Sequence, residues 1–400
     1  MARLPVPSLD LDLFSEASLS DPFADYRRLR DAGPVVRLER HDLYAMGRFA
    51  DVQAALRSSE ALISGEGVGF SAAFNAVRGR NVLQSDGDLH FRMRNAIMRP
   101  LAPSALKGAR AELKAMVAGR VAALTGHGWT DAMKTLAAFL PVEAVSHLVG
   151  LPNVGRERML DWAAATFNLI GPQQDSADFA ALGEMQAFMA SLSPETVRQG
   201  SWAGDLFAAA EAERLSYPEA MGAISAFIVP SLDTTILAKG HLLNNLAANP
   251  VQWALLKARP ELIPAAVLEG VRRDSALRWF SRVAVQDYEA DGAVVPKGAR
   301  VMLLYGCANR DERHYAEPDR FDVTRDARDH LAWGTGPHMC AGMHLARIEM
   351  EVLLEALVEA DVDLTASAPA MGVNAGLFGF RELPFRLDVA GTGPTRSGTN

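Results

Sequence analysis

Hydrophobic and polar residues follow two different periods along this chain, and each period has its own stretches. Between residues 103 and 264 apolar residues recur every three to four positions, which predicts successive amphipathic helices rich in Ala and Leu. Between residues 283 and 304 short β-branched runs are separated by the turn signals Asp291-Gly292 and Pro296-Lys297-Gly298, which is typical of short strands. The pattern therefore predicts a mainly α protein with a minor β region. It shows no strand–helix–strand alternation, which disfavours a doubly wound nucleotide-binding sheet.

Several further elements follow from the same pattern. We expect a helix at 21–33, a strand pair at 35–38 and 43–46, and a closing β-hairpin at 376–389. A helix from 218 to 249, bounded by Pro218 and Pro250, would run for ~45 Å. We interpret residues 1–390 as one domain and the small, polar residues 391–400 as a disordered tail.

Composition narrows the possible partners and the compartment. The 400 residues carry 40 basic and 48 acidic side chains, a net charge of −8, which disfavours a nucleic-acid binder. The two cysteines cannot form a disulfide framework, so a reducing cytoplasm is the expected location. The N-terminus lacks the pattern of a signal peptide, and no run of 18 apolar residues predicts a membrane span. We expect a cytoplasmic monomer that does not associate with membranes.

The most informative segment surrounds Cys340, in residues 331–349. Glycines flank this cysteine at positions 334, 336 and 342, and an amphipathic helical pattern follows. A Gly-rich loop that leads into a helix leaves backbone N–H groups free to face an anion, which favours a thiolate at that place. The alternative for an isolated cysteine is an inert side chain buried beside a tight turn.

This segment resembles the haem-ligand loop of the cytochrome P-450 family, F-G-x-G-x-H-x-C-x-G-x-x-L-A-R-x-E, with Trp333 in place of the usual Phe. The resemblance implies the cytochrome P-450 fold, with haem b (iron protoporphyrin IX) held between the long central helix and the cysteine-loop helix. It also implies that Cys340 is the axial ligand of the haem iron and that Trp333 and Gly334 lie against the cofactor.

Three more segments match the family in the correct order. Glu269-x-x-Arg272 corresponds to a buried structural pair, and the A-N-R-D and P-x-x-F segments follow at 308–311 and 318–321. An H-x-x-x-R pair precedes them, and the resemblance implies haem-propionate binding by a set of four residues: His90, Arg94, Arg282 and His338. The family's D-P-P before that pair is here Asp86-Gly-Asp.

The predicted central helix contains a lone carboxylate, Asp233, in an apolar stretch. Its surroundings, residues 230–235, resemble the family's A-G-x-D-T-T oxygen-activation groove, so the resemblance implies that Asp233 and Thr234 deliver protons. A threonine that bonds back to its own helix carbonyl is the alternative. Pro230 and Ser231 replace small residues of the family, and a proline here predicts a kink.

The resembled fold also suggests which side chains surround the substrate, a set that is apolar and partly aromatic: Val68, Phe70, Phe167, Ile170, Phe227, Val229, Pro230, Phe280 and Phe378. Residues 166–172 with 67–69 look like the bacterial subgroup that demethylates para-methoxybenzoates. That subgroup's cationic clamp is absent, because the matching positions are Glu66, Ser225 and Ala226. The resulting hypothesis is hydroxylation or O-demethylation of a small neutral aromatic substrate such as a methoxyphenol.

The family resemblance implies electrons from NAD(P)H through a ferredoxin reductase and a ferredoxin-type donor, for which Arg92 and Arg99 could form a local basic surface. Two alternatives stay open. One is a haem-thiolate protein that binds or senses a ligand without oxygenating it, although the presence of both Asp233 and Thr234 argues against this. The other is a peroxide-driven oxygenase.

Overall fold

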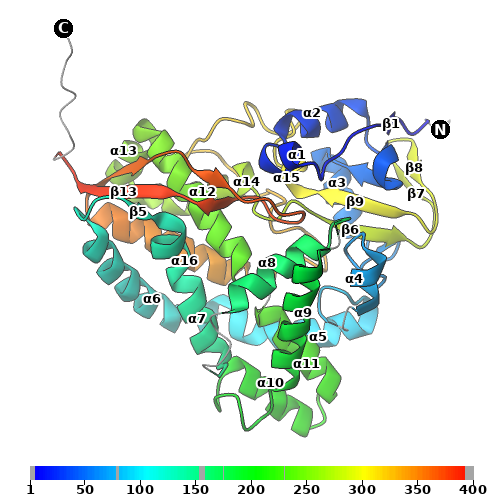
Figure 1. The fold of residues 1–400 in the computed structure, drawn as a ribbon, viewed down its shortest axis with the longest axis horizontal. Helices are drawn as coiled ribbons and strands as arrows, with labels where there is room; N and C mark the ends of the chain where they lie inside the picture. Colours follow the sequence, from blue (N-terminus) through cyan, green and yellow to red (C-terminus); the bar gives the residue numbers. More distant parts are fainter. Residues whose placement is uncertain (1–4, 78–80, 153–157, 174, 229, 392–400) are drawn as a thin grey trace.

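The computed structural model describes residues 5–77, 81–152, 158–173, 175–228 and 230–391, and for Val77 and Val145 only the backbone. Apart from Gly391, the expected tail lies outside these ranges. A helical body occupies most of the molecule, and a β-region formed by the N-terminal segment and residues near 280–304 lies at one end (Figure 1). The predicted fold class, mainly α with a minor β region, is confirmed.

Helices account for most of the regular structure in the described residues. They are α1 (Glu16–Ser20), α2 (Phe23–Ala32), α3 (Phe49–Arg57), α4 (Ala72–Val77), α5 (Gly87–Leu101), α6 (Pro103–Leu124), α7 (Phe139–Val149), α8 (Met159–Leu169), α9 (Ser176–Ala190), α10 (Trp202–Glu211), α11 (Tyr217–Ile228), α12 (Asp233–Ala248), α13 (Pro250–Ala258), α14 (Ile263–Arg273), α15 (Tyr305–Ala308) and α16 (Met343–Glu359). Short 3-10 segments η1 (Glu39–His41) and η4 (Pro260–Leu262) and the π-helical η2 (Met133–Ala137) complete them.

The strands form one larger sheet and three small ones. They are β1 (Ser8–Leu9), β2 (Val36–Leu38), β3 (Leu43–Met46), β4 (Leu62–Ile63), β5 (Thr130–Asp131), β6 (Trp279–Ala284), β7 (Tyr288–Ala290), β8 (Ala293–Val295), β9 (Arg300–Leu304), β10 (Val362–Ala366), β11 (Ala370–Met371), β12 (Phe380–Glu382) and β13 (Pro384–Val389). The larger sheet has the order β1-β2-β3-β9-β6-β4, in which β3 pairs with β9 in parallel and β2 with β3 antiparallel. The N-terminal segment thus pairs with strands about 260 residues later, through contacts such as Tyr44 opposite Val301.

The predicted C-terminal hairpin is wrong. The strands β12 and β13 do form, but β12 pairs with β11, whereas β13 lies between β10 and β5. Only Leu383 separates them, and one residue is too few to reverse the chain into a hairpin, which needs a loop of about two residues or more. Both strands therefore take partners from elsewhere in the chain.

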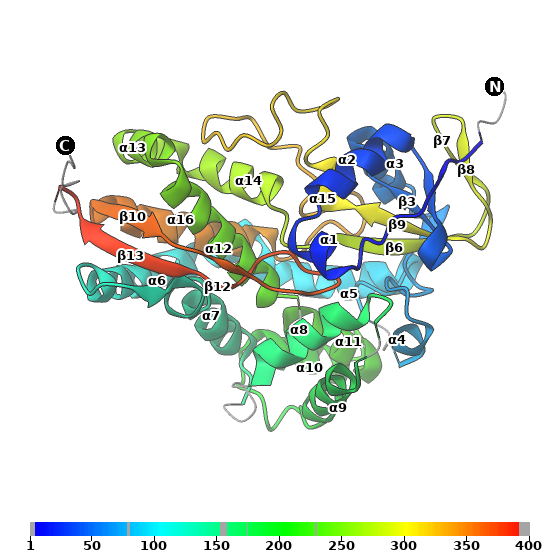
Figure 2. The same ribbon diagram turned by 45° about the horizontal axis from the view of Figure 1, so that its top comes forward.

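The expected central helix is interrupted at the expected place. It consists of α11 and α12, which end and begin on either side of Pro230. Proline cannot donate a backbone hydrogen bond and its ring crowds the preceding turn, so the predicted kink takes the form of a break. The helix α12 lies near the middle of the molecule in both views, and it packs against α13, α14 and β10 (Figure 2).

One stretch of the described residues, Tyr217–Ala248, is long and apolar enough by length and composition to cross a membrane. A buried core helix passes the same test, so this is weak evidence for a span. Many of its side chains contribute to the largest hydrophobic core, together with residues of α5, α6, α14 and α16.

Candidate active site

A cavity of about 840 Å³ lies where the helical body meets the β-region. Its walls come from α5, α8, α9, α11, α12, β6, the loop that precedes α16, and the start of α16. The volume is near the upper end of the range found for small-molecule and cofactor sites. Segments that are distant in sequence, from Val68 to Met350, therefore converge on one space.

Two glycines form the loop that carries Cys340. Gly334 and Gly336 have φ angles of 67° and 73°, which favour glycine, and a Cβ at Gly336 would lie 2.7 Å from the carbonyl oxygen of Leu56. The Cys340 amide donates to the carbonyl oxygen of Trp333 at 2.8 Å. Trp333, Gly334 and Cys340 all line the cavity, and α16 begins three residues after the cysteine.

The Cys340 thiol is not activated by the helix start alone. Burial raises its pKa, and this outweighs the backbone N–H groups of Gly342 and Met343 and the charge of Arg94, which act in the opposite direction. A thiolate at this place therefore needs a further positive charge beyond the loop and the helix start, because desolvation disfavours the charged form. A bound metal ion supplies the charge that deprotonates a coordinating thiol.

Two guanidinium groups face the cavity without an anionic partner. Arg94 and Arg282 both line it, and in the described part of the chain neither forms an ion pair with a carboxylate. Burial lowers the pKa of Arg94, which shows that its charge is not fully compensated. Buried cations need a counter-charge, and a ligand with two carboxylates would provide it. This donor set fits the propionates of haem.

The two histidines expected at the same place lie together but differ in access. The rings of His90 and His338 stack with their centroids 4.1 Å apart, and only His338 lines the cavity. The His90 Nε2 atom is buried and has no hydrogen-bond partner among the described residues, and burial with the nearby His338 lowers its pKa to about 4. His338 therefore lines the cavity and His90 does not, and a propionate contact from His90 stays a prediction.

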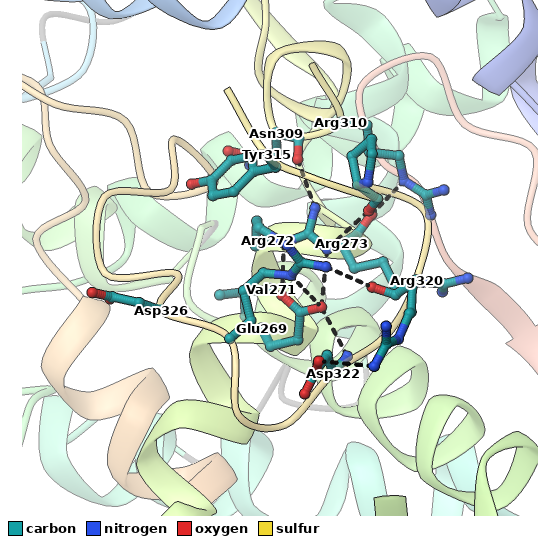
Figure 3. A network of polar contacts seen from close by, with 12 residues as sticks. Glu269, Val271, Arg272, Arg273, Asn309, Arg310, Tyr315, Arg320, Asp322 and Asp326 are labelled. Atoms are coloured by element: carbon teal, nitrogen blue, oxygen red, sulfur yellow. Dashed lines mark hydrogen bonds and ion pairs between the residues drawn. The ribbon is translucent and has the colours of Figure 1, made fainter. Parts of the chain in front are cut away.

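A network of buried polar contacts surrounds Glu269 and Arg272 (Figure 3). The Arg272 guanidinium donates to both carboxylate oxygens of Glu269, at 2.6 and 3.0 Å, and both side chains are fully buried. Arg272 also donates to the carbonyl oxygens of Asn309 and Pro318, at 2.8 and 2.9 Å. The Asn309 side chain in turn accepts from the amide of Leu331 at 2.7 Å, two residues before Trp333. The E-x-x-R and A-N-R-D segments are thus joined physically to the loop that carries Cys340.

The break between α11 and α12 faces the same cavity. Thr234 lines it, and its hydroxyl donates to the carbonyl oxygen of Pro230 at 2.8 Å, the back-bond that was the alternative interpretation. The Asp233 Oδ2 atom is buried without a partner in the described residues, and burial together with the charge of Asp161 raises the pKa of Asp233 to about 7. Asp233 can therefore exchange a proton near neutral pH.

Most of the predicted substrate-contacting residues line the cavity: Val68, Phe167, Ile170, Phe227, Pro230 and Phe280. Phe70 and Phe378 do not, and for these two the prediction is wrong. Phe70 stacks on Trp279 at 4.4 Å, and Phe378 stacks on His241 at 4.9 Å, so each ring is used in packing. Val229 lies outside the described residues.

The three positions that match the absent cationic clamp do not all lie at the cavity. Ser225 and Ala226 line the cavity, whereas Glu66 is exposed and lies outside the cavity wall. Glu66, which matches an arginine position of the clamp in the resembled subgroup, therefore puts no carboxylate into this cavity. Uncharged polar residues that were not predicted line the cavity instead, namely Asn81, Gln84, Thr166 and Gln186. Thr166 belongs to the segment 166–172 singled out above, whereas no periodicity or motif in the sequence distinguished the other three.

A cysteine that lines the cavity just before a helix, cations suited to two carboxylates, and a broken helix whose Thr234 faces the same cavity together define a haem-thiolate protein. Asp233 precedes Thr234 and does not itself line the cavity. Known proteins agree. A family model described as Cytochrome P450 matches residues 241–360. The chain is 31% identical over 398 residues to cytochrome p450 CYP199A2 of Rhodopseudomonas palustris, covering 96% of this chain and 95% of that protein. It is also 31% identical to the beta-dihydromenaquinone-9 omega-hydroxylase of Mycobacterium tuberculosis, covering 94% and 78%.

Solved structures show the same fold. The crystal structure of CalO2 matches with a TM-score of 0.83 and 26% identity, covering 95% of this chain and 99% of that chain. Epothilone D-bound cytochrome P450epoK matches with a TM-score of 0.84 and 26% identity, covering 95% and 99%. The chain belongs to the cytochrome P450 family and is a monooxygenase with haem b as its cofactor.

Proposed function

We propose that this P450 hydroxylates or O-demethylates a small neutral aromatic molecule, such as a methoxyphenol. The observation that carries the proposal is the distribution of charge around the cavity. Among its described lining residues the charged side chains are Arg94, Arg282 and Glu349, and with His338 they lie on the elements that surround the cofactor position. The walls from α8, α9 and α11 are apolar or neutral. A carboxylate substrate would be desolvated there without a cationic partner, which is costly.

Aromatic and small polar groups together suit such a substrate. Phe167, Phe227 and Phe280 offer ring surfaces for edge or offset stacking. The Ser225 hydroxyl donates to the carbonyl oxygen of Gly222 at 2.8 Å, so its lone pairs remain available to accept from a phenol. These contacts would orient a methoxy group toward the cysteine side of the cavity.

Haem bound through a thiolate supplies the reductive activation of dioxygen, which the sulfur ligand favours. The protein holds the proton source. Because the pKa of Asp233 is about 7, this carboxyl is partly protonated at neutral pH and can both donate and regain a proton. The Thr234 hydroxyl would turn from the Pro230 carbonyl to pass that proton into the cavity. Hydroxylation of a methoxy carbon gives a hemiacetal, which releases formaldehyde and leaves a phenol.

The proposed electron source is NAD(P)H through a ferredoxin reductase and a ferredoxin, with a cytoplasmic monomer as the working form. The suggested basic surface needs one revision. Arg92 is paired with Glu219 at 2.5 Å and so connects α5 to α11, which leaves Arg99 as the residue of the two available to an acidic donor protein. Haem-dependent oxygenases of this family receive electrons from outside, and this analogy supports the proposed electron source.

Titration of the purified protein with guaiacol and, separately, with 4-methoxybenzoate tests the substrate class. We expect the haem spin state to shift with the phenol and to stay unchanged with the acid. A shift with the acid alone would contradict the proposal. A matched variant, Ser225→Arg, should gain response to the acid because it places a cation in the neutral wall.

Turnover distinguishes the remaining alternatives. Oxygen consumption that yields an equivalent amount of product with a surrogate ferredoxin is expected. Product with hydrogen peroxide but none with reduced ferredoxin would identify a peroxide-driven oxygenase. Tight binding without product under either condition would identify a ligand sensor or carrier.

A further inference from the structure

A lysine and a glutamate form an ion pair inside the protein, at the wall of the cavity. The Lys239 Nζ atom lies 2.7 Å from Glu349 Oε2, and the two side chains are 0% and 2% exposed. Glu349 also lines the cavity, beside Leu345, Ala346 and Met350. Neither the proposed reaction nor the propionate-binding set uses this pair.

The pair connects the two helices that carry the functional groups on opposite sides of the cofactor position. Lys239 belongs to α12, five residues after Thr234, and Glu349 belongs to α16, nine residues after Cys340. Both helices pack against α14. Because Thr235 and Lys239 are four residues apart, they share a face of α12, and Thr235 lines the cavity. The ion pair therefore fixes the spacing between the proton-delivering helix and the thiolate-bearing helix.

The charges of Lys239 and Glu349 also affect the reduction potential of any redox group nearby. In a medium of low dielectric constant an unpaired charge acts over several ångströms with little screening. As a pair, Lys239 and Glu349 add no net charge to the cavity wall. Burial lowers the pKa of Lys239, and the charge of Glu349 and its hydrogen bond to the ammonium oppose this effect.

We propose that Lys239 and Glu349 are positioning residues of the haem site, which hold α12 and α16 at a fixed spacing and keep that wall of the cavity electrically neutral. Loss of one member should then change the haem environment as well as the stability of the fold. Loss of Lys239 leaves a negative charge, which makes it harder to add an electron to the iron. Loss of Glu349 leaves a positive charge and has the opposite effect.

The test uses the purified holoprotein in three forms: Lys239→Met, Glu349→Gln and the double variant. At neutral pH we expect the haem reduction potential to fall in Lys239→Met, to rise in Glu349→Gln, and to return toward that of the unmodified protein in the double variant. The melting temperature should fall by roughly 5–10 °C in each single variant and recover partly in the double variant. The absorption band of the reduced, carbon-monoxide-bound protein reports whether the thiolate remains.

A matched control separates positioning of the haem site from general stability. Asp274 and Arg310 form another buried pair, 2.7 Å apart with side chains 5% and 6% exposed, and neither lines the cavity. Asp274→Asn should lower the melting temperature and leave the reduction potential unchanged. Potentials that stay unchanged in both single variants, or that move in the same direction in both, would overturn the proposal. A potential that shifts equally in Asp274→Asn would also overturn it.

Discussion

At the scale of single residues, the two cysteines of this chain have different environments. Cys340 lines the cavity at the start of α16, whereas Cys307 is fully buried. Burial raises the pKa of Cys307 to about 12, and its thiol donates to the carbonyl oxygen of Tyr26. Cys307 is therefore a packing residue, and this contrast provides an internal control for the haem ligand.

We expect Cys340→Ala to abolish the thiolate-type absorption band of the reduced, carbon-monoxide-bound protein, because no other thiol reaches the cavity among the described residues. Cys307→Ala should keep that band in full, with a loss of stability of about 1 kcal/mol. Absorption spectra of both variants, expressed with ample haem precursor, provide the measurement. An unchanged band in Cys340→Ala would refute the assignment of the ligand.

The raised pKa of Asp233 predicts how the stability of the protein depends on pH. This pKa rises from 3.8 to about 7 on folding, a shift worth about 4 kcal/mol. The folded protein thus favours the neutral acid. The free energy of unfolding is therefore highest below pH ~4, where Asp233 is protonated in both states, and it falls as the pH rises to about 7. The asparagine in Asp233→Asn cannot ionise. As the pH rises from ~4 to about 7, the melting temperature of this variant should therefore increase relative to that of the unmodified protein. Parallel melting profiles for the two proteins would contradict the raised pKa.

At the scale of elements, the break at Pro230 is the main departure from a regular central helix. Pro230→Ala restores a backbone N–H that can donate to the preceding turn and so favours continuation of α11 toward α12. We expect a gain in stability of about 1 kcal/mol, a several-fold fall in product formed per oxygen consumed, and more hydrogen peroxide released.

The control for this substitution is Pro218→Ala. Pro218 is in the first turn of α11, where proline is well tolerated, so its removal should not stabilise the protein. Denaturant unfolding and oxygen-electrode measurements distinguish the two prolines. A Pro230→Ala variant that is less stable than Pro218→Ala would show that the break is the preferred conformation of this segment.

Elements also show where prediction from sequence succeeds and where it fails. The strands of 376–389 were recognised because their pattern of Phe and Leu is local, but their partners were wrong because pairing is decided by distant strands such as β5 and β10. The turn between β7 and β8 was recognised from Asp291-Gly292, since these residue types tolerate the positive φ angles that both adopt there.

At the scale of the whole molecule, the cavity brings together charges that the protein alone does not balance. Arg94 and Arg282 face it without carboxylate partners in the described part of the chain. Removal of haem should therefore lower the melting temperature for two reasons. The folded state loses a bound ligand, and the two guanidinium groups are left without a counter-charge and repel each other.

Calorimetry of haem-depleted and reconstituted protein provides this measurement. We expect a melting temperature at least ~10 °C lower without haem, because a ligand whose dissociation constant lies far below its concentration stabilises the folded state by several kcal/mol. In the variant Arg94→Leu/Arg282→Leu the difference should be smaller, because the apoprotein no longer holds two unpaired charges. A difference of equal size in both proteins would show that the arginines do not respond to the cofactor.

The sequence by itself determined the class of this protein, the proposed haem ligand Cys340, the order of its motifs, the predominance of helix and the interruption at Pro230, because each depends on residue type and on local spacing. Only the tertiary structure decided which aromatic rings face the cavity, that the His338 ring stacks on His90, that Glu66 lies at the surface, and that Lys239 forms an ion pair with Glu349. These outcomes depend on which distant segments pack together. A side chain's neighbours across 100 or more residues set its exposure and its charge state, and no local pattern records them.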